Sequence, residues 1–452
     1  MFGDILSVIS DTTIAATKGV GAEKKDKFRM NLLIALPAAL VAAILDVNVY
    51  IVLIGGTFFA GIVGILTNGM TPLTFIQSLS TGTRNCSNYH NSAWLDADRR
   101  GKESCIEEEM SMNNMKKIRE LSEQYALRQI ELRRQIHTHP ELGGQEFETG
   151  ALIENELRSM GVEVRRGYAK TGLVGLIHGK KGSGNTILIR ADMDALPMEE
   201  QSGEAFSSKH PGRMHACGHD THTAMLLGAA KLLMDNKDKV KGRVKFMFQP
   251  GEEGYKGALH MVEAGLLENP HVDAALGMHS QSASDYPTGT IMHTTGPSAA
   301  SADGFKVIVH GKGAHGASPE DGIDPVNILA HILIALQTIN SRERNQQEPL
   351  ILTIGQLIAG TAENIIPNDG YLTGTIRAFN QEVRAHAKRR LEEISKGIAA
   401  TFGATAEIQW YTEFAPTIND RALIAELDGY VRELLGDDRV KITEPQKGSE
   451  DF

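Results

Sequence analysis

The chain is poor in cysteine and has no excess of positive charge. Its 452 residues include only three cysteines, too few for the disulfide framework that staples small secreted domains. Lysine and arginine total 46 against 56 aspartates and glutamates, for a net charge of −10 at pH 7. This balance gives a nucleic-acid partner no electrostatic support. The chain is long enough for two or three domains, each with its own core.

Long uncharged runs occur only near the N-terminus, at residues 32–45 and 49–66. The second run approaches the roughly 20 residues of a membrane span, and the basic stretch Lys24–Arg29 favours a cytosolic N-terminus. Residues 1–82 are therefore predicted to form a hydrophobic helical hairpin. We favour membrane association of residues 30–66 over the alternative, a buried hairpin in a soluble domain.

The segment from Gly55 to Gly82 resembles the end of a sodium/proton antiporter-type transporter, but two short spans cannot enclose a transport pathway. Residues 83–115 show neither helical nor strand periodicity and are interpreted as a linker. Regular patterning begins after Met110, Met112 and Met115. We expect the folded enzyme to begin at one of these methionines, with a cytoplasmic location and the hairpin as an anchor.

From residue 116 onward, helical and strand patterns alternate, which indicates an α/β sheet with helices on both faces. Asp220 is expected to cap the helix that contains Ala224–Met234. The predicted strands of this first pattern lie at 162–165, 173–178, 186–190, 244–248 and 274–278, and the predicted helices include 149–160 and 224–234.

A second pattern interrupts the first. Its order of strand, helix, two strands, helix and strand is that of a ferredoxin-like α+β sandwich. A helix at 421–435 then resumes the first pattern. The first domain is therefore predicted at 116–296 and 413–452, with residues 297–412 inserted into it.

Three histidines and a cysteine lie within His215–His222. Cys217 and His219 are two positions apart, so both can reach one centre from an extended loop, and a thiolate can bridge two metal ions. The alternative is an inert buried cysteine beside core histidines, which three histidines in so short a segment make less plausible. His215 and His222 are left as residues that could orient the ligands.

Acidic pairs follow two of the predicted strands, at the sheet edge where open α/β folds place ligands. Asp192 and Asp194 could orient a ligand, although aspartate pairs are more often solvated. Glu252 and Glu253 follow so apolar a strand that burying both is costly without cations. One of the two could bind metal while the other acts as general base. His279 ends a further strand and suits a structural role as well as metal binding.

These motifs together resemble the aminoacylase/carboxypeptidase-type amidohydrolases, a branch of the di-metal exopeptidases that includes hippurate hydrolases and N-acyl amino acid amidohydrolases. The resemblance runs from about residue 120 to residue 452. It implies a zinc-exopeptidase-like catalytic domain with an inserted ferredoxin-like lid or dimerisation domain. The matching segments are His137–Leu142, Arg190–Pro197, His215–Asp220, Glu252–Glu253, Met278–His279 and Gly313–Pro319.

The resemblance implies two divalent metal ions, for which zinc, manganese, cobalt and nickel all suit the mixed donor set. Cys217 would be shared by both ions, Glu252 would be the general base, and Asp194 would support the ligands from behind. The implied metal ligands are Cys217, His219, Glu253 and His279.

The inserted domain would supply substrate contacts. His315 would donate to the scissile carbonyl or the oxyanion, in many relatives across the interface of a homodimer. Asn364 and Arg377 would hold the carboxylate of the substrate. An arginine suits planar carboxylate recognition, although a surface arginine on an edge strand is nearly as good an interpretation.

The predicted function is hydrolysis of N-acyl amino acids, such as hippurate-like or N-acetyl compounds, to a carboxylic acid and a free amino acid. A dipeptidase or carboxypeptidase of the same fold is the near alternative, and a membrane-anchored, non-catalytic remnant is the distant one. Members of the family continue beyond Gly448–Phe452 and supply one more histidine ligand there. Weak or absent activity is therefore expected for this chain.

Overall fold

The computed structural model describes residues 118, 120–254, 256–281, 286–287 and 289–452. The predicted hairpin at 1–82 and the predicted linker at 83–115 lie outside the described residues. Among the helices that are described, none combines the length and the apolar character needed to cross a membrane.

Contacts divide the described chain into two units. The first unit contains the described residues up to His293 together with Asp420–Ile442. The second unit contains Thr294–Asn419 and Thr443–Phe452. The last residues belong to the second unit because Ala300 N donates to Gln446 O at 3.1 Å and to Gly448 O at 2.9 Å.

The first unit is built on a five-stranded mixed sheet with the order β1-β2-β4-β3-β5. β3 runs parallel to both β4 and β5, so the carboxyl ends of these three strands share one edge. Every residue of β3 is buried, as expected for a strand covered on both faces. The strands are β1 (Glu163–Tyr168), β2 (Gly172–His178), β3 (Thr186–Asp192), β4 (Arg243–Gln249) and β5 (Ala274–Gly277).

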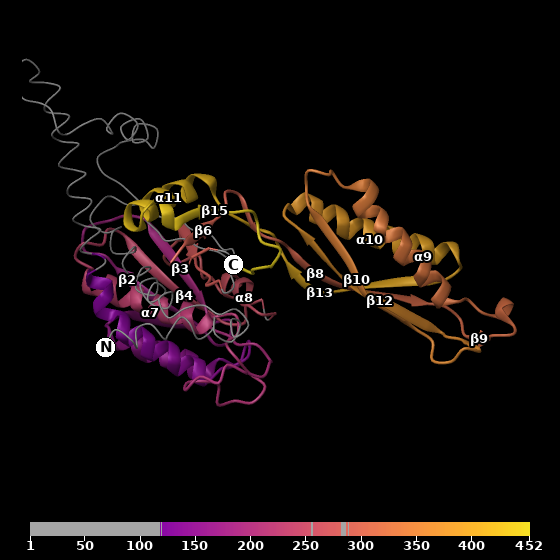
Figure 1. Ribbon diagram of the computed structural model, residues 1–452, viewed down its shortest axis with the longest axis horizontal. Coiled ribbons are helices and arrows are strands. Elements are labelled where there is room, and N and C mark those ends of the chain that lie inside the picture. Colours follow the sequence, from indigo (N-terminus) through magenta and orange to yellow (C-terminus); the bar gives the residue numbers. More distant parts are fainter. Residues whose placement is uncertain (1–117, 119, 255, 282–285, 288) are drawn as a thin grey trace, which may run out of the picture. The chain divides into compact units, whose positions relative to one another are not determined.

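Helices pack against this sheet through one continuous hydrophobic core, to which α7 and α11 both contribute. Figure 1 shows the strands running between α11 and the helical residues 120–138. A parallel pair, β6 (Ile291–His293) and β15 (Val440–Ile442), lies beside α11. The bounds of the labelled helices in this unit are α6 (Phe147–Ser159), α7 (His219–Asp235), α8 (Gly257–Glu263), α11 (Arg421–Leu435) and the 3-10 turn η3 (Asp437–Arg439).

The start of α7 differs from the prediction. The helix begins at His219, five residues before Ala224, and its N-cap is Gly218 rather than Asp220. Gly218 has φ +90°, and a Cβ atom there would lie 2.4 Å from Ser280 Oγ, so the turn requires glycine. The Asp220 carboxylate instead lies in the first turn, where Oδ2 accepts from Arg133 Nε at 2.6 Å.

The second unit has a four-stranded antiparallel sheet with the order β10-β12-β8-β13. Figure 1 shows α9 and α10 side by side on one face of this sheet, and both helices bury apolar side chains against it. The chain order β8, α9, β10, β12, α10, β13 is the βαββαβ order of a ferredoxin-like sandwich. These elements are β8 (Ala302–His310), α9 (Pro325–Thr338), β10 (Leu350–Ala359), β12 (Asp369–Ala378), α10 (Gln381–Thr401) and β13 (Thr405–Phe414).

Shorter elements complete the second unit. β9 pairs with β11, and β7 pairs with β14. Their bounds are β7 (Pro297–Ala299), β9 (Ala314–His315), β11 (Ile365–Ile366), β14 (Thr417–Ile418), the 3-10 turn η1 (Pro319–Asp321) and the π-helical turn η2 (Ile339–Glu343).

Candidate metal centre

The candidate site lies at the carboxyl edge of the parallel strands in the first unit. Asp192 ends β3, and Asp194 follows two residues later. Glu252 and Glu253 follow β4 across a Pro-Gly turn, and His279 follows β5. Because the three strands are parallel neighbours, these side chains emerge at the same edge of the sheet.

The predicted ligands converge in two overlapping groups. Cys217, His219 and His279 each offer a ligand atom, and these atoms lie within 4.8 Å of one another. Cys217 Sγ is 3.2 Å from His279 Nε2. His219, Glu252 and Glu253 form a second group under the same limit. Because His219 belongs to both groups, all the predicted ligands lie around one region of the first unit.

Asp194 makes hydrogen bonds to three residues of these groups. Its Oδ1 accepts from the backbone N–H of Glu252 at 3.1 Å, and its Oδ2 accepts from that of Glu253 at 3.0 Å. Oδ1 also lies 3.2 Å from His219 Nδ1. A carboxylate oxygen accepts in this contact, so Nδ1 carries a proton and Nε2 is the nitrogen left for a metal ion. One buried side chain therefore fixes both the turn that carries the glutamates and the orientation of a candidate ligand.

One nitrogen of the site, His219 Nε2, has its hydrogen-bonding capacity unused among the described residues. The His219 side chain is fully buried, and Nε2 has no hydrogen-bond partner among the described residues. Asp192 Oδ2 lies 3.5 Å from this nitrogen, which is long for a hydrogen bond. A buried donor or acceptor without a partner is costly. A metal ion bound at this nitrogen would remove the cost.

The electrostatics of the cluster also suit a cation. Burial lowers the pKa of His279 to about 3, which keeps the imidazole neutral and able to bind metal. Burial raises the pKa of Cys217 to about 12 and raises that of Glu253, because nothing in the protein compensates their negative charge fully. Burial opposes the charge on His219, yet Asp192 and Asp194 raise its pKa. A divalent ion would replace that proton and favour the thiolate.

The donor set therefore fits the implied metal ions. One thiol, two imidazoles and two carboxylates are the ligands that zinc and its neighbours among the transition metals take in proteins. The set is more acidic than its imidazoles can balance. His219 and Glu252 are buried, Cys217 and His279 are half-buried, and Glu253 is exposed.

Sequence reasoning gave no role to Glu146, which supports the same turn. Its Oε1 accepts from the backbone N–H of Gly251 at 2.8 Å, and its Oε2 accepts from Thr171 Oγ1 at 2.6 Å. Glu146 is fully buried, and burial raises its pKa. No periodicity or motif spacing signals this role, because the partner is a backbone group 105 residues away.

Nothing in the sequence pattern predicted the buried ionic cluster at the start of α7. Asp220 accepts from Arg133 Nε, and its Oδ2 lies 2.8 Å from His137 Nδ1. His137 Nε2 lies 3.3 Å from Glu200 Oε1. The positive groups come from the helix at 120–138, so the cluster anchors the loop that carries Cys217 to a distant part of the chain.

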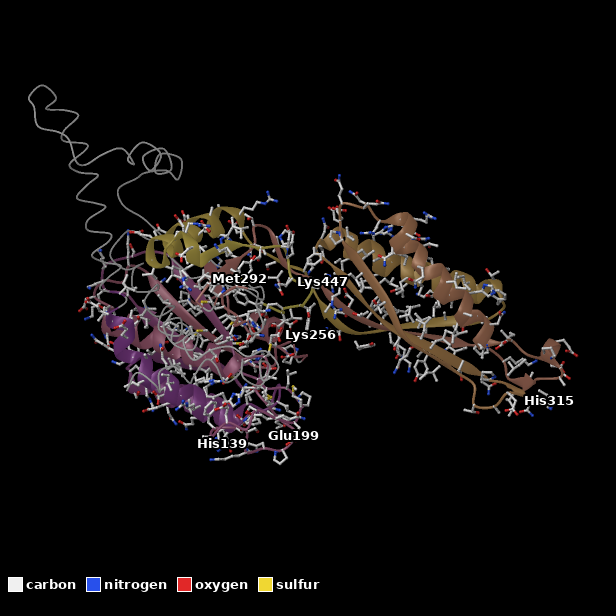
Figure 2. The ribbon with its side chains drawn as sticks, viewed as in Figure 1. His139, Glu199, Lys256, Met292, His315 and Lys447 are labelled. Atoms are coloured by element: carbon white, nitrogen blue, oxygen red, sulfur yellow. The ribbon has the colours of Figure 1, made fainter. Side chains whose placement is uncertain are left out.

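The three predicted residues of the second unit do not all meet. His315 pairs with Ile365 in the β9–β11 ribbon, and Gly316 N donates to Asn364 O at 2.8 Å, so His315 and Asn364 are neighbours. Figure 2 places His315 at the tip of this unit. Arg377 lies near the far end of β12, which begins at Asp369. Eight residues of strand correspond to about 26 Å.

A mixed α/β sheet whose parallel edge gathers a thiol, imidazoles and carboxylates is typical of a metal-dependent enzyme. The chain belongs to Peptidase family M20/M25/M40, whose description matches residues 188–452, more than half of the chain. The predicted resemblance to the aminoacylase/carboxypeptidase-type amidohydrolases is thereby confirmed, as is the mixed α/β fold. A lid or dimerisation role for the second unit stays a prediction.

Individual relatives agree with this assignment. The chain is 41% identical over 325 residues to N-acetyl-L-cysteine deacetylase of Bacillus subtilis, covering 72% of this chain and 76% of the relative. It is 43% identical over 326 residues to thermostable carboxypeptidase 1 of Saccharolobus solfataricus, covering 72% and 81%. The crystal structure of the Bacillus subtilis YXEP protein, named a dinuclear metal binding peptidase, aligns with a TM-score of 0.61 and 37% identity over 72% of this chain and 84% of that chain.

Proposed function

We propose that this chain hydrolyses the amide bond of N-acyl amino acids to a carboxylic acid and a free amino acid. The observation that carries the proposal is the convergence of Cys217, His219, Glu253 and His279 beside Glu252. The name of one relative supports it, since N-acetyl-L-cysteine is an N-acyl amino acid. The carboxypeptidase relative favours a second candidate, cleavage of a C-terminal residue from a peptide.

We assign the metal-binding role to Cys217, His219, Glu253 and His279. When bound, two divalent ions would polarise the amide carbonyl and lower the pKa of a water molecule. Zinc, manganese, cobalt and nickel all suit the donor set.

Glu252 would act as the general base. It is buried, its ligand atom lies within 4.8 Å of that of His219, and its backbone is held by Asp194. Its carboxylate would take a proton from the attacking water and later give it to the leaving amine. Asp194 cannot take this role, because both its oxygens are used by backbone N–H groups and by His219.

The pair Glu252→Gln and Glu253→Gln tests these assignments. Glu252→Gln should lower kcat by about 10²–10⁴-fold, the usual contribution of general-base catalysis, and keep its metal. Glu253→Gln should lose bound metal, measured by mass spectrometry after metal loading. Loss of metal from Glu252→Gln would show that Glu252 is a ligand instead.

A panel of substrates separates the two candidate reactions. Benzoyl- and acetyl-amino acids should be cleaved faster, by kcat/KM, than dipeptides that carry a free amino group. The reverse order would favour the peptidase.

The second unit would complete the site with His315, Asn364 and Arg377. His315 would donate to the carbonyl oxygen of the substrate, and the other two would hold its carboxylate. A small N-acyl amino acid cannot contact both Asn364 and Arg377 of one chain, because most of the length of β12 separates them. If both contact one substrate, they come from two copies of the chain.

We propose a homodimer through the second unit, which would account for this separation. β10 is an edge strand of the described sheet, with Leu357 37% and Ile358 47% exposed. On α9, Val326 and Ile334 are also exposed. An apolar edge strand with unpaired backbone groups is prone to pair with another strand. Pairing of two β10 edges would cover these side chains.

A further inference from the structure

Besides the candidate ligands His219 and His279, a third histidine, His222, lies close to the site. Its ligand atom lies within 4.8 Å of those of Asp192 and His219, so distance alone does not separate a ligand from a supporting residue. Its hydrogen bonds do. His222 Nε2 lies 2.7 Å from the backbone nitrogen of Ser280. A backbone N–H can only donate, so Nε2 carries no proton and its lone pair is already used.

The other ring nitrogen of His222 is also engaged. Nδ1 lies 2.6 Å from Asp192 Oδ1 and donates its proton there. Asp192 is fully buried, and its Oδ2 lies 2.9 Å from Arg190 Nη1. Oδ1 is therefore hydrogen-bonded to His222, and Oδ2 forms an ion pair with Arg190. His222 has no free lone pair to offer a metal ion.

Ser280, whose N–H is held by His222, also contacts His279. His279 Nδ1 lies 2.7 Å from the carbonyl oxygen of Ser280. A carbonyl can only accept, so Nδ1 carries the proton and Nε2 keeps its lone pair. That Nε2 is the atom 3.2 Å from Cys217 Sγ. The tautomer of His279 needed for metal binding thus depends on where the Ser280 carbonyl lies.

The surrounding packing leaves this arrangement little freedom. The rings of His222 and His279 are 4.6 Å apart at 61°. Gly218 lacks the Cβ atom that would lie 2.4 Å from Ser280 Oγ. The connected set is Arg190, Asp192, His222, Ser280 and His279.

We propose that His222 is a positioning residue, not a metal ligand: by accepting from the Ser280 N–H it holds the carbonyl that fixes the tautomer and orientation of His279. This inference rests on the proposed metal site. It gives the third histidine of the His215–His222 segment a role distinct from that of His219. Partners that orient a metal-bound histidine commonly change metal affinity by about 10–100-fold when they are replaced.

Two amide variants test the two hydrogen bonds of His222 one at a time. His222→Gln keeps an oxygen for the Ser280 N–H. His222→Asn places its amide near the Nδ1 position, keeping the bond to Asp192 and losing the Ser280 contact. His293→Gln is the control, because His293 is another buried histidine of the first unit, bound to Asp428 at 2.7 Å and outside the ligand groups.

The first measurement uses metal-free protein labelled with 15N-histidine, with His279 assigned from the His279→Gln spectrum. The ring nitrogen shifts of His279 should show the Nδ1–H tautomer in the unsubstituted chain, in His222→Gln and in His293→Gln. His222→Asn should shift His279 to a mixture of tautomers. An unchanged His279 tautomer in His222→Asn would overturn the proposal.

The second measurement is titration with Co²⁺ alone, followed by its visible spectrum. His222→Asn should bind Co²⁺ about 10–100-fold more weakly than the unsubstituted chain, and His222→Gln should recover most of that loss. A purely structural role predicts the opposite: both variants and His293→Gln would lose thermal stability with cobalt affinity unchanged. If the unsubstituted chain binds no Co²⁺, the proposed function fails, and the tautomer measurement still decides the role of His222.

Discussion

At the scale of single residues, the site depends on carboxylates that serve more than one group. Asp194 holds two backbone N–H groups and one imidazole, and Asp192 pairs with His222 and Arg190. Such side chains bring no chemistry to the substrate. They determine where the groups that do can lie.

Replacing Asp194 tests this role. In the unsubstituted chain, each oxygen of Asp194 accepts from a backbone N–H group. In Asp194→Asn, one of these oxygens becomes an NH₂ group, so two donors would face each other. We expect metal affinity to fall about 10–100-fold and the free energy of unfolding to fall by about 1–3 kcal/mol. Metal titration and urea unfolding measure the two effects. Unchanged values in both would show that Asp194 does not hold the turn.

His137 should make stability depend on pH. Burial disfavours its charged form, but Asp220 and Glu200 outweigh burial and raise its pKa from 6.5 to about 9. Because the folded chain binds this proton more tightly, the contribution is complete below about pH 6.5. It declines as the pH rises and is gone above about pH 9, at a total of at most about 3 kcal/mol.

Urea unfolding between pH 6 and pH 9.5 measures this contribution. The unsubstituted chain should lose stability across the range, and His137→Gln should lose less. Equal slopes for the two proteins would contradict the assignment.

The residues that carry chemistry were easier to predict than those that hold them. Cys217, His219 and Glu253 could be singled out because their residue types recur at the ends of apolar runs, which parallel strands bring to one edge. Glu146 and Arg133 could not, because their partners lie 105 and 87 residues away in the sequence. A buried charge carries no local pattern that reveals its partner.

At the scale of elements, α7 shows where pattern reasoning fails. The helix was predicted from its apolar part, whereas it begins at His219 with polar residues that are all buried. Burial normally selects apolar side chains, and here a functional site reverses that selection. By contrast, α11 follows the prediction at both ends, since its amphipathic pattern is uninterrupted and Asp420 caps it.

The turn into α7 gives a prediction at this scale. Gly218→Ala combines a backbone conformation unfavourable for alanine with a Cβ atom 2.4 Å from Ser280 Oγ. We expect a loss of about 1–2 kcal/mol from the left-handed conformation alone, and weaker metal binding because Ser280 must move. Gly212→Ala is the matched control, since Gly212 has φ +72° and an open position for Cβ. Equal metal affinity in the two variants would contradict the account.

At the scale of the whole molecule, the βαββαβ order of the second unit was predictable from strand and helix patterns. Thr443–Phe452 also belongs to this unit, through hydrogen bonds with Ala300 rather than through any sequence pattern of its own. The two-unit division is reflected in the proposed chemistry, with metal ligands on the first unit and substrate-binding residues on the second.

The proposed homodimer can be tested on the edge strand. Ile358→Lys should convert a dimer to a monomer, because a charge on the β10 edge would be buried against its copy. Tyr411→Lys is the control, since Tyr411 is 60% exposed on β13, the opposite edge of the sheet. Light scattering coupled to size-exclusion chromatography measures the mass. A mass unaffected by Ile358→Lys would exclude pairing through β10.

The predicted division at the start of the chain has its own test. A fragment of residues 110–452 should be expressed in soluble form and bind metal like the whole chain, because the described residues supply both cores and all four proposed ligands. Insolubility of the fragment beside a soluble whole chain would contradict this prediction.

Anomalous diffraction from crystals of the metal-loaded chain tests the central claim most directly. The account predicts two peaks, both within bonding distance of Cys217 Sγ, with His219, Glu253 and His279 as further ligands and His222 unligated. Peaks elsewhere, or a Cys217 thiol with no ion beside it in loaded crystals, would contradict it.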